Sequence, residues 1–353
     1  MAASALPVGM LSPHVTRSPT PLSRLSAIGV ALTRRELEAL VPAGGGWQEC
    51  EVDNHGADAG RWPAALVRPS ALVCAWLDEA RARTSVRGHW SCSITQLEQA
   101  PSPWGQPMWQ AKDQHGRVVA QAPVVVVAAA LGSLDLIKSS RPASDPDGLP
   151  LRPVKGQLSL AALQGRPFSP RPQRNQGVFV PCYEDSAMPP SWPARVWTMG
   201  STYDRGVDNR DITDEAHLRN GASLSQLNPQ AAQHLETERL AGRLMGWAEV
   251  RCASLDRLPL VGALPDIQVG SQTPATSTGK RRHPPLGNMP RRAGLYTLCA
   301  LGSRGLSLAT LCGQTLARQL EGEPDDLDPD LMDALDPARF AWRRMRRQLP
   351  VAA

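Results

Sequence analysis

The sequence predicts an α/β fold in which a nucleotide-binding domain is interrupted by a second domain built on a mixed sheet. Three observations support this prediction. Residues 123–130 form an unbroken run of Pro, Val and Ala, which is typical of a strand buried on both faces. Residues 295–301 have strand length and lead through glycines into leucines at helical intervals up to position 320. Between these two places, short apolar segments separated by turn residues predict further strands.

Composition bounds the class of protein. A chain of 353 residues is long enough for two domains with a large core, and 42% hydrophobic and 20% charged residues are typical of a globular protein. No apolar run has the length needed to cross a bilayer, and the first residues lack the basic start and apolar core of a signal peptide. We therefore expect a cytoplasmic protein without membrane contact.

The cysteines and the net charge say little by themselves. Seven cysteines are scattered without any C-x-x-C pair, so we expect no disulfide framework and no metal site, and we interpret the cysteines as core fillers. The net charge of +5 and the pI of about 9.0 permit an anionic partner such as RNA without requiring one.

Local patterns predict the elements of the first half. Residues 22–41 carry apolar side chains at helical spacing, and 71–82 follow a Pro-Ser start, so both are expected to be helices. The segment 47–63 is expected to be irregular. Segments 91–97, 108–113 and 117–122 have strand character and predict an antiparallel meander.

The second half is expected to follow a Pro/Asp/Gly linker at 141–150. We predict strands at 154–160, 177–181 and 196–202, a helix at 235–247 and a flexible insertion at 268–292. An acidic link at 321–330 and a short basic helix at 337–347 close the chain. We assign 1–45, 66–145 and 294–347 to the nucleotide-binding domain, and 46–65 with 146–293 to the substrate domain.

The turn Gly302-Ser-Arg-Gly305 carries the first functional signal. A strand that ends in glycines just before a helix leaves several backbone N–H groups pointing at one spot, which suits an anion or a polarised carbonyl oxygen. Arg304 adds a positive charge with a planar donor fork. The alternative is an ordinary helix start with an exposed arginine.

Several stretches, in the same order along the chain, carry a family resemblance. They are residues 9–14 with 21–24, 153–159, Gly-Ser-Thr-Tyr-Asp-Arg at 200–205, 251–262 with Pro265-Asp266, Leu-Gly-Ser-Arg-Gly-Leu at 301–306, and 335–340. Together they resemble the FAD-dependent D-amino-acid-oxidase and glycine-oxidase superfamily. Within it they are most similar to the oxidase half of bifunctional tRNA 5-methylaminomethyl-2-thiouridine biosynthesis proteins. The resemblance runs from about residue 3 to 347.

The resemblance implies an FAD/NAD(P)-binding Rossmann-like domain with FAD as cofactor. It implies an oxidoreductase acting on 5-carboxymethylaminomethyl-(2-thio)uridine at the tRNA wobble position. A hydride would leave the glycyl methylene for the flavin, and water would split the resulting imine into 5-aminomethyl-uridine and glyoxylate. The implied partners are the tRNA anticodon loop and a separate methyltransferase that acts on the product.

The chain departs from the family in three ways. It lacks the G-x-G-x-x-G turn that holds the ADP half of FAD, it lacks the methyltransferase half, and Thr310 stands where the family has proline. We therefore expect weak FAD binding, which an added upstream strand and helix would restore. Two alternatives stay open: an oxidase of glycine or another small amino acid, and a flavin-free RNA-binding relic.

Arg251 is the predicted catalytic clamp, because a bidentate Arg–carboxylate pair would fix both the position and the angle of the substrate. The alternative is an arginine on a strand edge paired to Asp256, and we expect Arg257 to brace Asp256 or the turn at Asp266. Tyr203 and Arg205 are predicted to contact substrate or RNA. A loop tyrosine packed between domains is the alternative for Tyr203.

The cofactor-binding residues follow from the resemblance. They are Gly156, Gln157, Gly302, Ser303, Arg304, Gly305 and Leu306. Gly156 would let the flavin approach its strand closely, although it could equally be an ordinary strand glycine. The basic segment 280–282 and the helix end with Arg343, Arg344, Arg346 and Arg347 are predicted to contact tRNA phosphates, with a merely solvated helix face as the alternative.

Overall fold

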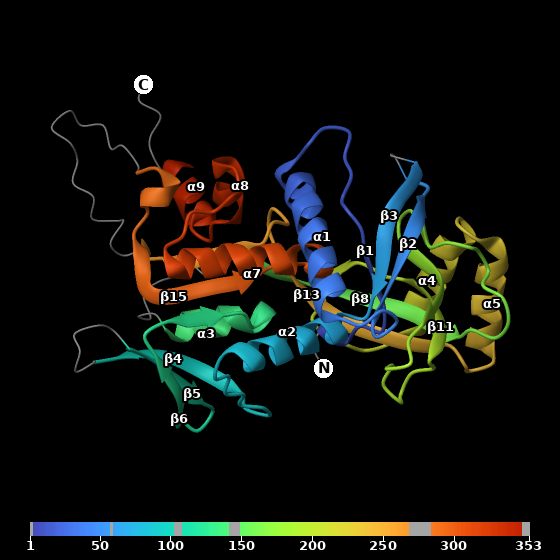
Figure 1. Ribbon diagram of the computed structural model, residues 1–353, viewed down its shortest axis with the longest axis horizontal. Coiled ribbons are helices and arrows are strands. Elements are labelled where there is room, and N and C mark those ends of the chain that lie inside the picture. The colour runs from blue at the N-terminus through green and yellow to red at the C-terminus, as the bar shows by residue number, and fades with distance from the viewer. Residues whose placement is uncertain (1–2, 57–58, 102–107, 141–148, 268–283, 348–353) are drawn as a thin grey trace. The chain divides into compact units, whose positions relative to one another are not determined.

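The computed structural model describes residues 3–56, 59–101, 108–140, 149–267 and 284–347 (Figure 1). The chain divides into two compact units. The first contains residues 1–87, 153–251 and 304–311, and the second contains 88–152, 252–303 and 312–353. Three of the borders fall inside regular elements, two strands and one helix, so the chain passes between the units there within one element. The predicted functional domains, which are drawn by role, stay a prediction.

The first unit is built on one large mixed sheet. Its strands are β1 (Gly9–Leu11), β2 (Trp47–Asn54), β3 (Gly60–Val67), β8 (Leu151–Ala162), β9 (Gln173–Arg174), β10 (Val178–Glu184), β11 (Arg195–Gly200), β12 (Asp204–Arg205) and β13 (Met245–Ser254). The order is β1-β3-β2-β9-β10-β11-β8-β12, with β13 also paired to β8. Neighbours are antiparallel except β2 and β9, which run parallel. Strand β8 therefore contacts three partners, β11, β12 and β13.

Both faces of this sheet are covered, because successive side chains on a strand point to opposite sides. On one face Leu158 and Leu160 of β8 join a cluster with Val180, Tyr183 and Val196. The other face is covered by helices α4 (Asp214–Ser225) and α5 (Pro229–Leu240), which lie beside the sheet in Figure 1. There the cluster contains Phe179, Trp197, Met199, Leu224 and Leu235.

Helices α1 (Pro21–Leu40) and α7 (Gly305–Glu321) cross closely within the first unit. Helix α1 begins at the N-cap Thr20, where a capping box with Ser23 satisfies the first amides. A Cβ added at Gly29 would lie closer than 3.0 Å to the carbonyl oxygen of Ser307, so only glycine fits this crossing. Beside it the hydroxyls of Thr33 and Thr310, both buried, share a 2.7 Å hydrogen bond. The threonine in place of the family's proline thus has a defined partner.

The second unit carries two small sheets. Strands β14 (Leu260–Pro265), β15 (Arg291–Cys299) and β7 (Val125–Val127) form one, with β15 parallel to β7. Strands β4 (Ile94–Ala100), β5 (Met108–Asp113) and β6 (Val118–Ala122) form an antiparallel meander. Buried Trp109, Val127, Ile137, Leu260 and Leu295 share one core.

Further helices of the chain are α2 (Pro69–Arg83), α3 (Ser133–Ser139), α8 (Pro329–Leu335) and α9 (Arg339–Arg347).

Most predicted elements are confirmed. Helices α1 and α2, the meander β4–β6, and strands β8, β10 and β11 all form within a few residues of their predicted bounds. The strand–turn–helix around Gly302 forms as β15 followed by α7, and the closing basic helix is α9. The α/β fold class is likewise confirmed. Helices α3, α4 and α8 were not predicted, although the Thr213 side chain caps α4 by accepting a hydrogen bond from the Ala216 amide.

The prediction that segment 47–63 is irregular is wrong. This segment forms most of the antiparallel pair β2–β3. Glu49 and Glu51 point to solvent while Val52 is buried, so the strand alternates, with charged residues on its outer face. The predicted helix 235–247 is also wrong in its second half. Helix α5 ends at Leu240, Gly242 takes a φ of +69°, and β13 begins at Met245.

The Val/Ala run 123–130 is not a strand buried on both faces. Only Val125–Val127 forms β7, and Val124 and Val126 are 43% and 38% exposed. Among the described residues, β7 pairs with β15 alone. Only one face of β7 packs into the core, through Val127. One covered face explains why the side chains alternate between buried and exposed.

The described part of the predicted insertion is ordered by packing. Leu286 and Met289 are buried against α9, and the Arg291 guanidinium donates to both oxygens of Asp336 at 2.7 and 2.6 Å. The rest of that insertion, and most of the linker 141–150, lie outside the described residues. The cysteines are not all core fillers, since Cys74 and Cys92 are exposed.

The described residues contain neither a membrane-spanning helix nor a cluster of metal ligands. No helix there is both long and apolar enough to cross a bilayer. No group of three or more His, Cys, Asp or Glu side chains in the described ranges is arranged to hold a metal ion.

Substitution of Gly29 by alanine tests the α1–α7 crossing. The new methyl group would overlap the Ser307 carbonyl, so the helices must separate or distort, at a cost of about 1–3 kcal/mol of unfolding free energy. Gly313→Ala in α7 is the matched control, because a Cβ there meets no heavy atom within 4 Å. It should stabilise the chain by up to about 1 kcal/mol. Urea unfolding of both variants checks this, and equal effects would contradict the crossing.

Candidate functional site

Arg251 lies on β13 of the first unit, and its guanidinium is held by neutral oxygens. It donates to the Thr202 carbonyl at 3.3 Å and to the Ser201 hydroxyl. In the described chain no carboxylate lies within ion-pair distance of it. Burial lowers the pKa of the Arg251 guanidinium, yet an arginine stays charged at any physiological pH. The result is a partly buried cation that no described carboxylate contacts directly, although the nearby charge of Asp204 favours its protonated form.

Gly156 of β8 forms the seat of this guanidinium. A Cβ added to Gly156 would lie closer than 3.0 Å to three atoms of the Arg251 guanidinium. The absence of a side chain at 156 therefore lets the guanidinium pack directly on the β8 backbone. The guanidinium of Arg251 approaches the backbone closely here, which explains the glycine. The approach of the flavin to Gly156 stays a prediction.

Tyr203 and Arg205 lie next to Arg251. The guanidinium carbons of Arg251 and of Arg205 are each 5.8 Å from the centroid of the Tyr203 ring, a cation–π distance. Tyr203 is 47% exposed, and Arg205 is exposed as well. Between them Asp204 accepts two hydrogen bonds from Arg219, at 2.6 and 2.9 Å, which lower the pKa of its carboxyl.

Gln157 is fully buried and supports the loop that carries Tyr203. Its amide N–H donates to the Thr202 hydroxyl at 3.0 Å, and its side chain exchanges two 2.8 Å hydrogen bonds with the Thr213 backbone. These bonds engage both the nitrogen and the oxygen of the side-chain amide. A role for Gln157 in holding a cofactor stays a prediction.

A second buried network continues this support from β8 to α4. The Ser159 hydroxyl lies 2.7 Å from Nδ1 of His217 and accepts a 2.9 Å hydrogen bond from Asn220, which also donates to the Gln157 carbonyl. Burial lowers the pKa of His217, which favours its neutral ring. The network fixes the strand that seats Arg251.

Asp256 does not pair with Arg251. Its partners are Arg339, which is 1% exposed and donates at 2.8 and 3.0 Å, and Arg343 at 3.0 Å. Burial alone would raise the pKa of Asp256, but these two guanidinium groups lower it to about 2. The strand-edge alternative for Arg251 is therefore wrong. The expectation that Arg257 braces Asp256 is also wrong, since Arg339 does so.

The predicted turn joins β15 to α7. Gly302 has a φ of +58°, and its amide donates to the Cys252 carbonyl at 2.9 Å. A Cβ on Gly302 or Gly305 would meet no heavy atom within 4 Å, so the backbone is open on that side. Ser303 is exposed, and Arg304 accepts the Ser307 amide through its carbonyl.

This open backbone at a helix start fits the flavin-ring end of an FAD molecule, where amides would meet negative charge. The side chain of Leu306 is turned elsewhere: it packs among Leu11, Leu37 and Val67 and against Gly9. Any contact of Leu306 with a cofactor would therefore come from its backbone. Its contact, like those of the other turn residues, stays a prediction.

The structure brings Arg251, Tyr203, Arg205, Gly156 and Gln157 together in the first unit, and the Gly302 amide joins the turn to the residue after Arg251, through the Cys252 carbonyl. Sequence reasoning missed the supporting residues: Ser201, Thr202, Ser159, His217, Asn220 and Arg219. The Gly-Ser-Thr-Tyr-Asp-Arg motif contained the signal for the first two. No local pattern marked the others, which act across distant segments.

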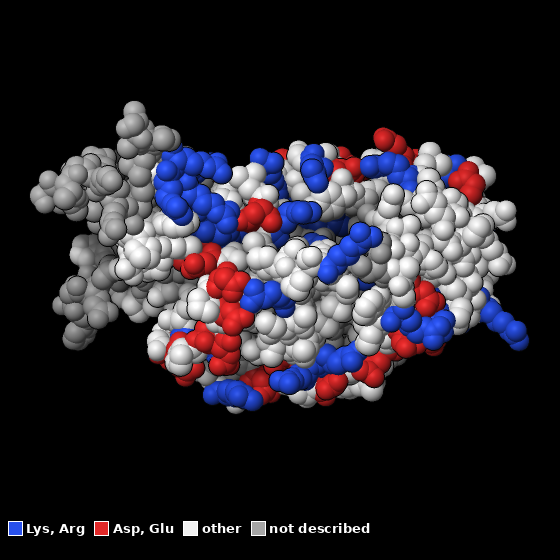
Figure 2. All heavy atoms as spheres, turned by 90° about the horizontal axis from the view of Figure 1, so that it is seen from above, with Lys and Arg blue, Asp and Glu red and all other residues white. Residues whose placement is uncertain are grey.

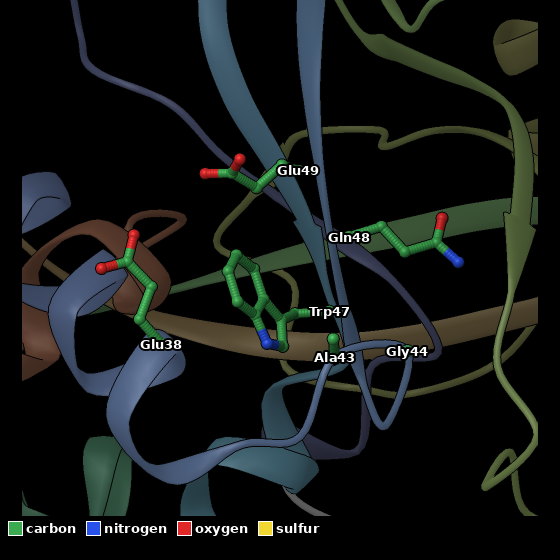
Figure 3. A pocket seen from close by; sticks show the side chains of 6 residues that line it. All are labelled: Glu38, Ala43, Gly44, Trp47, Gln48 and Glu49. Carbon is green, nitrogen blue, oxygen red and sulfur yellow. The ribbon is translucent and has the colours of Figure 1, made fainter.

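A surface hollow elsewhere in the first unit is lined by Glu38, Ala43, Gly44, Trp47, Gln48 and Glu49 (Figure 3). The figure shows Trp47 and Glu49 on one side of the strand and Gln48 pointing to the other. The Trp47 indole donates to the Val41 carbonyl at 3.1 Å. The polar groups do not converge, so the hollow is not a site.

Comparison with known proteins gives the family. The family model described as FAD dependent oxidoreductase, named DAO, matches residues 4–319. Two similar proteins are both called tRNA 5-methylaminomethyl-2-thiouridine biosynthesis bifunctional protein MnmC. The one from Verminephrobacter eiseniae is 33% identical over 96% of this chain and 58% of its own length. The one from Delftia acidovorans is 32% identical over 97% and 56%. The chain thus spans a little over half the length of these relatives.

Solved structures share the fold. Glycine oxidase from Geobacillus kaustophilus has a TM-score of 0.61 at 16% identity, over 93% of this chain and 86% of its own. Iminodiacetate oxidase from Chelativorans sp. BNC1 has a TM-score of 0.61 at 16% identity, over 95% and 89%. The family match covers most of the chain and agrees with the mixed α/β architecture. The chain belongs to the DAO family of FAD-dependent oxidoreductases.

Proposed function

We propose that this chain oxidises 5-carboxymethylaminomethyl-(2-thio)uridine at the wobble position of tRNA, giving 5-aminomethyl-uridine and glyoxylate. Family membership supports FAD-dependent oxidation, and the MnmC relatives, named for tRNA 5-methylaminomethyl-2-thiouridine biosynthesis, suggest the substrate. One observation carries the proposal. The Arg251 guanidinium is partly buried, is held in a fixed orientation, and has no carboxylate partner among the described residues.

A buried cation without an anion is costly unless a ligand supplies the opposite charge. The glycyl end of the proposed substrate is a carboxylate, which an arginine binds through two parallel hydrogen bonds. Ser201, Thr202 and Gly156 fix the guanidinium before the substrate arrives, so little freedom is lost on binding. Arg251 is therefore suited to orient the carbon–nitrogen bond that is oxidised.

FAD, when bound, supplies the two-electron acceptor for this oxidation. The methylene carbon loses a hydride, the nitrogen loses a proton, and water then hydrolyses the carbon–nitrogen double bond to an amine and an aldehyde. The chain's own residues hold the carboxylate. Asp204 does not serve as a base, because Arg219 occupies its carboxylate and lowers its pKa. An amine bound in its neutral form needs no strong base from the protein.

A free glycine-like amino acid is the alternative substrate, since Arg251 alone would bind its carboxylate. The exposed Tyr203 and Arg205 beside Arg251 favour a larger substrate with an aromatic group and negative charge. A separate methyltransferase acting on the product is also part of the proposal, and so is a cytoplasmic location.

Helix α9 offers a basic surface for the tRNA backbone. Figure 2 shows Lys and Arg side chains gathered over this helix, whose last turn carries Arg344, Arg346 and Arg347. The Arg346 guanidinium lies 4.6 Å from the Trp342 ring. Arg343 is bonded to Asp256. We assign the phosphate contacts to the three arginines of the last turn.

Arg251→Lys tests the clamp. Lysine keeps the charge but loses the planar fork, so binding of an anticodon hairpin with the modified uridine should weaken by roughly 1.5–3 kcal/mol. Fluorescence anisotropy with a labelled hairpin measures this, and thermal unfolding by circular dichroism checks that the fold persists. Arg166→Gln, at an exposed arginine of the same unit, is the control and should change little. Unchanged affinity of Arg251→Lys would place the clamp elsewhere.

Gly156→Ala tests the contact between Gly156 and the Arg251 guanidinium without removing a charged group. The added methyl group must push the Arg251 guanidinium from its place, so affinity for the modified hairpin should fall at least about tenfold, the loss of one charged hydrogen bond. Gly287→Ala, where a Cβ meets nothing within 4 Å, is the control. If both variants bind the hairpin like wild type, Gly156 does not position Arg251.

The triple replacement of Arg344, Arg346 and Arg347 by Gln tests the basic helix. Each lost phosphate contact should reduce the slope of log affinity against log salt by about 0.7, and binding should weaken equally for modified and unmodified hairpins. A salt series in filter binding measures the slope. The control replaces three dispersed exposed arginines, Arg87, Arg152 and Arg166. Equal slopes for the two triple variants would leave α9 as a solvated face.

A further inference from the structure

Tyr203 is an unusual surface side chain, because the backbone on both sides of it is fixed while its ring is 47% exposed. Before it, the Thr202 amide donates to the Gln157 carbonyl at 3.1 Å, and the Thr202 hydroxyl accepts the Gln157 amide at 3.0 Å. After it, Asp204 and Arg205 form β12 on the edge of β8. The ring is thus an aromatic surface on a rigid support.

The segment after Tyr203 is fixed by charge as well as by strand pairing. Asp204 makes its two hydrogen bonds with Arg219 of α4, and the Gly206 amide donates to the Pro153 carbonyl at 3.0 Å. Buried Lys155 on the facing strand donates to Asn209 at 2.8 Å. An aromatic group held in this way binds a flat partner with little loss of conformational entropy.

Three different binding chemistries lie side by side here. Arg251 is a partly buried cation suited to a carboxylate, Tyr203 is an exposed aromatic ring, and Arg205 is an exposed cation. Each guanidinium carbon is 5.8 Å from the ring centroid, so Tyr203 lies within cation–π distance of both arginines. In the described chain Arg205 has no carboxylate within ion-pair distance, and it is therefore able to move off the ring towards a ligand.

We infer that Tyr203 and Arg205 form a recognition platform for a single nucleotide, on which the wobble base stacks against Tyr203 while Arg205 binds a flanking phosphate. The inference rests on the proposed function and names the residues that read the RNA part of the substrate. A nucleobase gains stacking energy on any aromatic ring, and guanidinium groups suit phosphate oxygens. A carboxylate-bearing uridine nucleotide has a carboxylate for Arg251, a base for Tyr203 and a phosphate for Arg205, so it complements all three side chains.

A mutant cycle between protein and RNA tests the stacking contact. The probe is an anticodon hairpin carrying 5-carboxymethylaminomethyl-uridine at the wobble position, compared with the same hairpin lacking the wobble base. Tyr203→Leu should weaken binding of the first hairpin roughly 10- to 100-fold. It should have little further effect on the second, since the base that stacks is gone. Tyr203→Phe keeps the ring and should stay close to wild type. Trp90→Leu, at a tryptophan that is 71% exposed, is the matched control.

Arg205 is tested by charge. Arg205→Gln should weaken binding of both hairpins and reduce the salt slope by about 0.7, whereas Arg205→Lys should keep the slope. Arg166→Gln is again the control for loss of one exposed charge. The platform is overturned if Tyr203→Leu weakens both hairpins equally, if it weakens neither, or if the Arg205→Gln slope equals that of wild type.

The failure of the platform is distinguishable from failure of the proposed function. If wild type prefers the modified hairpin to an unmodified one and needs Arg251 for this preference, the proposed function stands even where the Tyr203 and Arg205 variants bind normally. If wild type shows no preference for the modified uridine, the substrate assignment fails. Lack of any hairpin binding by wild type would overturn both.

Discussion

The contact between the Arg251 guanidinium and the backbone of Gly156 is the constraint on which the candidate site depends. A charged planar group lies flat against a strand only where no side chain intervenes, and position 156 is glycine. Because the Ser201 hydroxyl and the Thr202 carbonyl each accept a hydrogen bond from it, the guanidinium is oriented without being neutralised. A neutral set of acceptors satisfies the geometry of an arginine but leaves its charge for a ligand. A carboxylate partner within the protein would have occupied the hydrogen-bond donors of Arg251 and also neutralised its charge.

Strand β8 makes this arrangement possible, since it pairs with β11, β12 and β13. Gly156 and Gln157 on β8, Tyr203 next to β12 and Arg251 on β13 are therefore held by the same set of backbone hydrogen bonds. The buried bonds of Ser159 with His217 and Asn220 connect this strand to α4. A change in any of these elements would be felt by the others, because buried polar groups are costly to leave without partners.

The parts of the fold that could be predicted were those with local signals. Helix α1 follows from its leucine spacing, and the β15–α7 connection follows from the two glycines after an apolar run. The pair β2–β3 could not be recognised, because outward-facing Glu49 and Glu51 hide the alternation and β2 also pairs with the distant β9. Arg251 was predicted from its motif. The role of Gly156 was not, since it is decided by a contact with a strand far along the chain.

Two arginines that follow short motifs show how the structure separates support from recognition. Arg339 is fully buried and all its donors are used, by Asp256 and by the carbonyls of Leu258, Pro259 and Asp336. Its charge is balanced within the fold, so its function is to fix the turn after β13. Arg251 lies only five positions before Asp256 in the sequence, yet it is bonded to neutral oxygens and not to that carboxylate. The sequence places both among motif residues, and only the identity of their partners distinguishes the structural cation from the one that is arranged to meet an anion. Charge balance, rather than burial, is thus the property that supports the proposed role of Arg251.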